Sequence, residues 1–156
     1  MLPLEAVGFK MAPGMKRKVR ILLAEDNPGD VFLVKRALDF HRIDYELSLA
    51  TNGEEAISLV HRADGGDLTI DLMLVDLNLP RYDGGQVVAA VRASTFLART
   101  PIIILTSSDS PHDRSRLFEL GASLYFRKPA DLMAFMEVGR LVEEVVAAND
   151  KLAQRL

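Results

Sequence analysis

The chain has 156 residues, of which 49% are hydrophobic, and its formal net charge is −3. This length and apolar content predict one globular domain with a sizeable core, and they exclude a wholly disordered chain. The mild negative charge gives no sign of a nucleic-acid partner or of a polybasic membrane patch. The absence of cysteine excludes disulfides and thiolate chemistry, and it suits a cytoplasmic location.

The two ends of the chain differ in pattern from its middle. The first 17 residues contain two prolines and two glycines and show no helical or strand-like periodicity. We expect residues 1–17 to form a flexible extension, residues 18–147 to form the domain, and residues 148–156 to end the last helix or fray. No apolar run approaches the roughly 20 residues of a membrane-spanning helix, so we expect no membrane partner.

Between these ends, short apolar runs alternate with helical patterns. Five runs have the length and composition of strands: Val19–Ala24, Tyr45–Ala50, Leu72–Val75, Ile102–Leu105 and Leu124–Arg127. Helical patterns follow them: one after Pro28, one from Thr51, whose spacing from Glu54 is that of a capping box, and others at about 85–94, 111–120 and from Ala130 onward. Strict alternation predicts an α/β fold, a parallel sheet covered by helices on both faces.

Polar side chains follow four of the five predicted strands. Glu25 and Asp26 follow the first strand, Asp76 the third, Thr106 the fourth and Lys128 the fifth. In open parallel sheets, ligands bind outside the carboxyl ends of the strands. If the central strands are neighbours, these five side chains converge on one small site.

The chemistry of such a site follows from its charges. Three carboxylates close together repel one another, and a hard divalent cation with oxygen ligands, Mg²⁺ or Mn²⁺, relieves the repulsion. The carboxylate of Asp76 can act as a nucleophile toward a phosphoryl group, while Lys128 and the hydroxyl of Thr106 stabilise the phosphoryl oxygens. Each residue also has a plain structural explanation, since Asp76 alone is typical of a turn and Lys128 of a loop. The complete set, each member at its own strand end, is far more specific.

These residues lie in motifs that strongly resemble the receiver domains of two-component response regulators. The motifs are Leu-Leu-Ala-Glu-Asp-Asn at 22–27, Val-Asp-Leu-Asn-Leu-Pro at 75–80, Asp-Gly at 83–84, Ile-Leu-Thr-Ser at 104–107, Gly-Ala at 121–122 and Arg-Lys-Pro at 127–129. The resemblance covers about residues 19–146 and implies a flavodoxin-like, doubly wound (βα)₅ fold with strand order 2-1-3-4-5. It is greatest to the stand-alone regulators that serve phytochrome-type histidine kinases.

The resemblance also implies roles for individual residues. Asp76 would be the phosphoacceptor, and Glu25, Asp26, Asp76 and the backbone carbonyl of Asn78 would hold Mg²⁺, with Mn²⁺ as a substitute. Thr106 and Lys128 would bind the phosphoryl group. Tyr125 would be the switch aromatic that follows Thr106, and the bond before Pro129 would be cis.

The same resemblance implies a phosphorelay protein and not an enzyme that acts on other substrates. It would accept a phosphoryl group from a sensor histidine kinase or a phosphotransfer protein, and it would assist its own phosphorylation and dephosphorylation. Because no output domain follows the receiver pattern, we expect output through a protein contact on the fourth helix, fifth strand and fifth helix. Apolar residues of the last helix, Val138, Leu141 and Val145, could support a homodimer there. The alternative is a receiver-like interaction module that is not phosphorylated.

Overall fold

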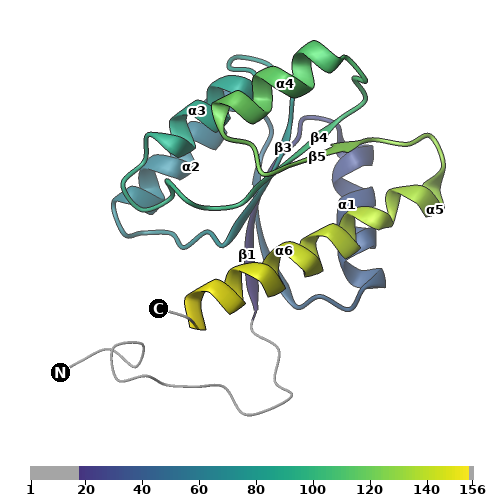
Figure 1. Cartoon of the computed structure of the whole chain (residues 1–156), viewed down its shortest axis with the longest axis horizontal. Helices are drawn as coiled ribbons and strands as arrows, with labels where there is room; N and C mark the ends of the chain where they lie inside the picture. The colour runs from purple at the N-terminus through teal and green to yellow at the C-terminus, as the bar shows by residue number, and fades with distance from the viewer. Residues whose placement is uncertain (1–17, 155–156) are drawn as a thin grey trace.

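The computed structural model describes residues 18–154, and Figure 1 shows them as one sheet with helices on both sides. All five strands pair in parallel, in the order β2-β1-β3-β4-β5. The predicted doubly wound, flavodoxin-like class is therefore confirmed. The strands are β1 (Val19–Ala24), β2 (Tyr45–Ala50), β3 (Leu72–Asp76), β4 (Ile102–Thr106) and β5 (Leu124–Arg127). The prediction of a flexible segment at 1–17 lies outside the described residues.

Six helices connect and complete the sheet within the described part of the chain. They are α1 (Pro28–Phe40), α2 (Gly53–Asp64), α3 (Gly84–Arg92), α4 (Pro111–Leu120), α5 (Leu132–Phe135) and α6 (Glu137–Gln154). Figure 1 shows α1, α5 and α6 together on one side of the sheet and α2, α3 and α4 on the other. None of these helices has the length and apolar content that a membrane crossing requires.

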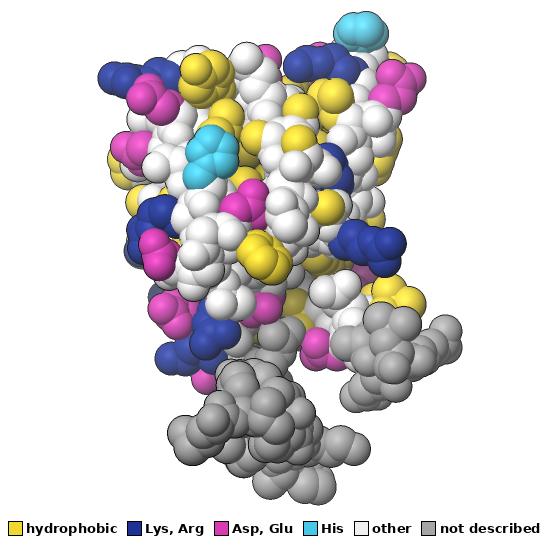
Figure 2. Space-filling model, turned by 90° about the vertical axis from the view of Figure 1, so that its left-hand side faces the viewer, with side chains coloured by type: hydrophobic (Ala, Val, Ile, Leu, Met, Phe, Trp, Pro, Cys, Tyr) yellow, Lys and Arg dark blue, Asp and Glu magenta, His cyan; other side chains and the backbone are white. Residues whose placement is uncertain are grey.

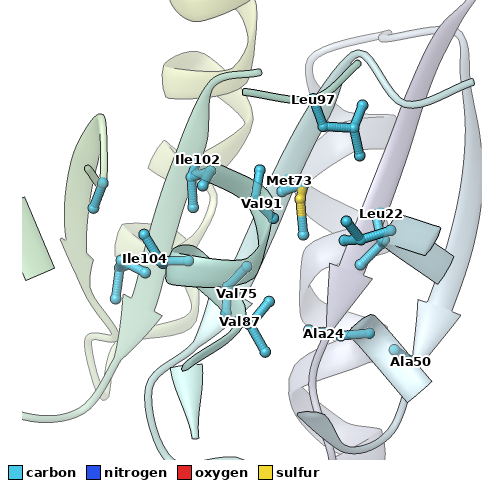
Figure 3. Packing of buried hydrophobic residues seen from close by; sticks show 14 of the residues in the cluster. Leu22, Ala24, Ala50, Met73, Val75, Val87, Val91, Leu97, Ile102 and Ile104 are labelled. Atoms are coloured by element: carbon cyan, nitrogen blue, oxygen red, sulfur yellow. The ribbon is translucent and has the colours of Figure 1, made fainter. Parts of the chain in front are cut away.

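The central strands are apolar along their whole length because helices cover both of their faces. Along β3, Met73 and Val75 belong to the core under α2, α3 and α4, while Leu72 and Leu74 belong to the core under α1, α5 and α6. Figure 3 shows Val87 and Val91 of α3 directed toward the sheet beside Met73 and Val75. All the residues of β3 and β4 are buried, so this part of the sheet is a rigid base for whatever follows its strands.

The surface carries both signs of charge. Figure 2 shows one side of the molecule, on which Lys and Arg side chains alternate with Asp and Glu and with scattered apolar groups. This face therefore offers no continuous basic surface of the kind that binds nucleic acid.

The start of α2 differs from the prediction by one residue. We expected Thr51 and Glu54 to form a capping box, and that pairing was wrong. In the structure Asn52 is the cap, and its side chain accepts a 2.8 Å hydrogen bond from the N–H of Glu55. The carboxylate of Glu55, in turn, accepts the N–H of Thr51 at 2.8 Å. Both Thr and Asn cap helices, and Asn is the stronger of the two.

The last helical segment also differs, because the single helix expected from Ala130 is divided into α5 and α6. The division falls at Met136, whose carbonyl oxygen lies 3.0 Å from Nε2 of His41 at the end of α1. The same contact region needs a glycine, since a Cβ on Gly139 would lie 2.5 Å from the carbonyl oxygen of Ala37. Close packing of α6 on α1 therefore accompanies the break.

Candidate functional site

Three carboxylates meet at the carboxyl edge of the sheet. Strands β1 and β3 are neighbours with Ala24 beside Val75, so the residues that follow them lie side by side. One oxygen from each of Glu25, Asp26 and Asp76 lies within 4.8 Å of the others. Glu25 and Asp76 are only 1% and 6% exposed, while Asp26 faces the solvent. The structure thus brings together the three acidic side chains that the sequence placed at one site.

Lys128 lies at the centre of this group. Its Nζ is 2.7 Å from Oε2 of Glu25, 2.8 Å from Oδ2 of Asp30 and 3.3 Å from Oδ2 of Asp76. The backbone holds it there, because the N–H of Lys128 donates a 2.7 Å hydrogen bond to the carbonyl of Thr106 and continues the pairing of β4 with β5. One ammonium group therefore neutralises part of the charge of three carboxylates.

Asp30 is the member of the site that the sequence reasoning missed. It lies in the first turn of α1, three residues after the cap Asn27, where a carboxylate is favoured by the helix dipole. A signal was present, since Asp30 is four residues after Asp26 on a helix that begins at the carboxyl edge of the sheet. That position fits a plain first-turn acid equally well, so only the structure shows its contact with Lys128.

Burial and the charges of neighbouring groups shift the pKa values of Glu25 and Lys128. Burial, together with the nearby charge of Asp76, raises the pKa of Glu25 to about 7, although Lys128 and the N–H of Asn27 act in the opposite direction. Burial by itself would lower the pKa of Lys128, but hydrogen bonds to Asp30 and Glu25, with the charge of Asp76, hold that pKa above its usual value. The lysine therefore stays charged, while the carboxylates are left with more negative charge than the protein neutralises.

Two further predicted residues surround Asp76. The N–H of Asn78 donates a 3.2 Å hydrogen bond to Oδ1 of Asp76. Thr106 ends β4, one register step beyond the pair Asp76 and Leu105, and it is fully buried. Its Oγ1 accepts a 3.1 Å hydrogen bond from the N–H of Ser108. Asp76 is thus held by a lysine at one oxygen and by a backbone N–H at the other.

The start of α3 packs tightly against the backbone of Asp76. The N–H of Gly84 donates to the carbonyl of Leu77 at 2.9 Å, and a Cβ on Gly84 would lie 2.5 Å from the carbonyl oxygen of Asp76. Asp83 caps the helix in a reciprocal capping box with Gln86. Beside this turn opens a cleft of about 480 Å³, which is lined by Asp26, Leu77, Asn78, Leu79, Pro80, Asp83, Asp113 and Arg116.

The donor set fits a hard divalent cation. All three clustered side chains offer carboxylate oxygens, which Mg²⁺ and Mn²⁺ prefer. The raised pKa of Glu25 shows that charge there is costly, and a bound cation would remove that cost. Both oxygens of Glu25 already accept hydrogen bonds, from the N–H of Asn27 at 3.1 Å and from Lys128 at 2.7 Å. A metal would therefore share Glu25 with these donors.

The remaining two predicted residues lie on β5 and just after it. Tyr125 is half-buried and donates a 2.9 Å hydrogen bond from its hydroxyl to the carbonyl of Ser108. The expected cis bond before Pro129 was wrong, because no peptide bond within residues 18–154 is cis. The trans form is the intrinsically favoured one for a bond to proline, by about 0.5–1 kcal/mol.

Comparison with known proteins now identifies the family. The model of the response regulator receiver domain matches residues 21–138, which include every residue of the site described above. This chain belongs to the response regulator receiver family. Response regulator Rcp1 from Synechocystis is 31% identical over 125 residues, which cover 79% of this receiver and 85% of Rcp1.

Solved structures of receivers share this fold, and some of them hold a divalent metal ion. The phosphorylated cyanobacterial phytochrome response regulator RcpA superposes with a TM-score of 0.76 and 28% identity, covering 85% of this receiver and 96% of RcpA. The Mn²⁺-bound form of Rcp1 has a TM-score of 0.72 and 31% identity, and the match covers 80% of this receiver and 91% of Rcp1. A third structure is the receiver domain of sensor histidine kinase PA1611 from Pseudomonas aeruginosa, which holds magnesium in its active-site cleft. It has a TM-score of 0.69 and 27% identity, and the match covers 84% of this receiver and 99% of that domain. The family's signalling role, phosphorelay, is therefore the role of this receiver.

Proposed function

We propose that Asp76 is the residue that accepts the phosphoryl group. One carboxylate oxygen attacks the phosphorus of the donor, the bond from phosphorus to the leaving group breaks, and the leaving group departs with the bonding electrons. The product is an acyl phosphate on Asp76. The observation that carries this assignment is the position of Asp76, buried between Glu25 and Lys128 at the end of the central strand β3.

The neighbours of Asp76 would stabilise the transferring group. Lys128 keeps its charge and lies 3.3 Å from Asp76, so it can neutralise a phosphoryl oxygen. The hydroxyl of Thr106 is buried at the next strand end and can donate to another oxygen. Such positioning and charge neutralisation are most of what phosphoryl transfer requires from a protein.

A divalent cation completes the proposed site. Glu25, Asp26 and Asp76 would hold Mg²⁺ through carboxylate oxygens, and the backbone carbonyl of Asn78 is the proposed fourth protein ligand. When bound, the cation would neutralise charge on the transferring phosphoryl group. The metal-bound structures of Rcp1 and of the PA1611 receiver domain support this proposal.

Receiver domains take their phosphoryl group from histidine kinases or phosphotransfer proteins, and we propose a histidine kinase of the phytochrome type as the donor. The similarity to RcpA, a cyanobacterial phytochrome response regulator, supports this choice. A cytoplasmic location and the lack of a nucleic-acid partner stay predictions from the sequence.

We further propose that output, and a homodimer if one forms, use the surface of α4, β5 and the last helix. The structure changes the residues that can take part. Val138 is fully buried in the core and is unavailable to a partner, contrary to expectation. Leu141 and Val145 are partly buried beside it, so α6 offers only a narrow apolar contact.

Phosphorylation by a small acyl phosphate tests the acceptor. We expect wild type to gain the mass of one phosphoryl group from acetyl phosphate in the presence of Mg²⁺, and Asp76→Asn to gain none. Asp67→Asn, the same change in the loop between α2 and β3 at the opposite edge of the sheet, is the matched control and should behave as wild type. Wild type that gains no mass, or Asp76→Asn that gains as much, would favour the alternative of an interaction module without phosphorylation.

A further inference from the structure

The ammonium group of Lys128 has no donor to spare for a phosphoryl group. An ammonium group offers three N–H donors, and three carboxylates accept from it: Glu25 at 2.7 Å, Asp30 at 2.8 Å and Asp76 at 3.3 Å. The lysine has little freedom to turn elsewhere, because its side chain is only 11% exposed and its backbone N–H is bound to the carbonyl of Thr106. A phosphoryl oxygen that binds Lys128 therefore has to displace one of these carboxylates or share a donor with it.

The three carboxylates differ in what their release from Lys128 would cost. The side chain of Glu25 is 0% exposed, so water cannot replace the lysine as its donor. Asp76 would carry the phosphoryl group itself and would stay beside it. The side chain of Asp30 is 25% exposed, so water can supply the hydrogen bond that this carboxylate gives up. Asp30 is therefore the carboxylate that Lys128 can release at the lowest cost.

Asp30 is also the carboxylate whose charge a bound metal would not neutralise directly. Among the described residues, the acidic cluster with metal-binding spacing consists of Glu25, Asp26 and Asp76 and leaves out Asp30. The backbone of Asp30 is fixed in the first turn of α1, where its N–H donates to the cap Asn27 at 3.3 Å. Its negative charge thus stays near an incoming phosphoryl group, which adds about two negative charges, and repels that group.

We propose that Asp30 is a positioning residue that competes with the phosphoryl group for the ammonium of Lys128, and so limits how tightly the site holds that group. This inference rests on the function proposed above. Replacement of Asp30 by asparagine keeps the shape of the side chain and removes its charge. Lys128 should stay in place, because Glu25 and Asp76 still hold its ammonium. The weaker competition and the lost repulsion both favour the phosphoryl group, by about three- to ten-fold for a partly exposed ion pair.

Titration calorimetry with beryllofluoride, a phosphoryl mimic, tests this inference at constant ionic strength. Each protein is titrated first with Mg²⁺ and then with beryllofluoride at saturating Mg²⁺. The variants are Asp30→Asn, the charge-conserving Asp30→Glu, and Asp131→Asn as the matched control. Asp131 lies three residues after Lys128, and its carboxylate caps α5 by accepting the N–H of Met133 at 3.1 Å. Asparagine caps helices equally well, so this control removes a nearby charge and keeps the fold.

We expect Asp30→Asn to bind beryllofluoride about three- to ten-fold more tightly than wild type. Its affinity for Mg²⁺ should be equal to that of wild type or lower, because a negative charge near the metal ligands is gone. These opposite directions separate competition from a loss of structure, which would weaken both. Asp30→Glu should lie closer to wild type than Asp30→Asn does, and Asp131→Asn should match wild type.

The possible failures of this test are distinguishable. If wild type binds beryllofluoride and Asp30→Asn binds it no more tightly, the role of Asp30 is refuted while the acceptor stands. An equal gain in Asp131→Asn would also refute that role, since it would show a general effect of charge. If wild type itself does not bind beryllofluoride in the presence of Mg²⁺, the proposed function fails, and this inference fails with it.

Discussion

Replacement of Lys128 by methionine tests the charge balance on which the site depends. Methionine keeps an unbranched apolar side chain and removes the ammonium group. The three carboxylates that Lys128 contacts differ in exposure: the side chain of Glu25 is 0% exposed, that of Asp76 is 8% and that of Asp30 is 25%. Without the cation, two buried carboxylates face each other with no neutralising partner.

The size of the effect follows from this burial. Removal of one partner from a buried ion pair costs about 3–5 kcal/mol. We expect a cost at the lower end of this range for two reasons. Solvent reaches Asp30, and Glu25, whose pKa is already raised to about 7, can take up a proton and lose its charge. We therefore expect a loss of about 3 kcal/mol in the free energy of unfolding at pH 8 without metal, and a smaller loss at pH 6, where Glu25 is protonated.

Urea unfolding in EDTA and in saturating Mg²⁺ measures this loss. Mg²⁺ supplies a cation to the same carboxylates, so the loss should shrink when it is present. The double variant Glu25→Gln/Lys128→Met should be more stable than Lys128→Met, because it removes one of the repelling charges. Lys35→Met, an exposed change on α1, should lie within about 0.5 kcal/mol of wild type. Lys128→Met as stable as wild type in EDTA at pH 8 would refute this reasoning.

Three other predictions concern separate parts of the molecule. Gly84→Ala should slow phosphorylation by acetyl phosphate, because its Cβ would displace the carbonyl of Asp76. Gly65→Ala, whose Cβ would make only ordinary contacts at 3.6 Å, should not slow it, and equal rates for the two variants would contradict this. Arg92→Ala should lose about 2 kcal/mol in urea unfolding, since Arg92 donates to three backbone carbonyls, and no loss would count against it. Metal-free wild type should lose stability as pH rises from about 4.5 to about 7. The reason is that folding raises the pKa of Glu25, so the folded state binds a proton that the unfolded state has already lost in this range. The stability of Glu25→Gln should decline less over the same range.

The sequence predicts the sheet well because its strands are set by burial. Runs such as Leu72–Val75 and Ile102–Leu105 are apolar without interruption, which only strands covered on both faces tolerate at that length. Parallel pairing then places the residue after each strand at the same edge. For this reason Glu25, Asp76 and Lys128 could be assigned to one site before any contact was known.

What the sequence did not predict depends on contacts between distant segments. The choice of Asn52 over Thr51 as the cap of α2 separates two residues that both cap helices. The break at Met136 accompanies the packing of α6 on α1, which no local pattern records. The contact of Asp30 with Lys128 joins residues 98 positions apart. The stacking of Arg114 on the ring of Tyr125 likewise joins α4 to β5.

Chemical trapping of the phosphorylated residue tests the central claim most directly. Reduction of an acyl phosphate with borohydride converts the modified aspartate to homoserine, and peptide mass spectrometry locates it. After treatment with acetyl phosphate and Mg²⁺, we expect homoserine at position 76 and nowhere else in the chain. Reduction at Asp26 or Asp30, with Asp76 unmodified, would contradict the proposal that Asp76 is the phosphoacceptor.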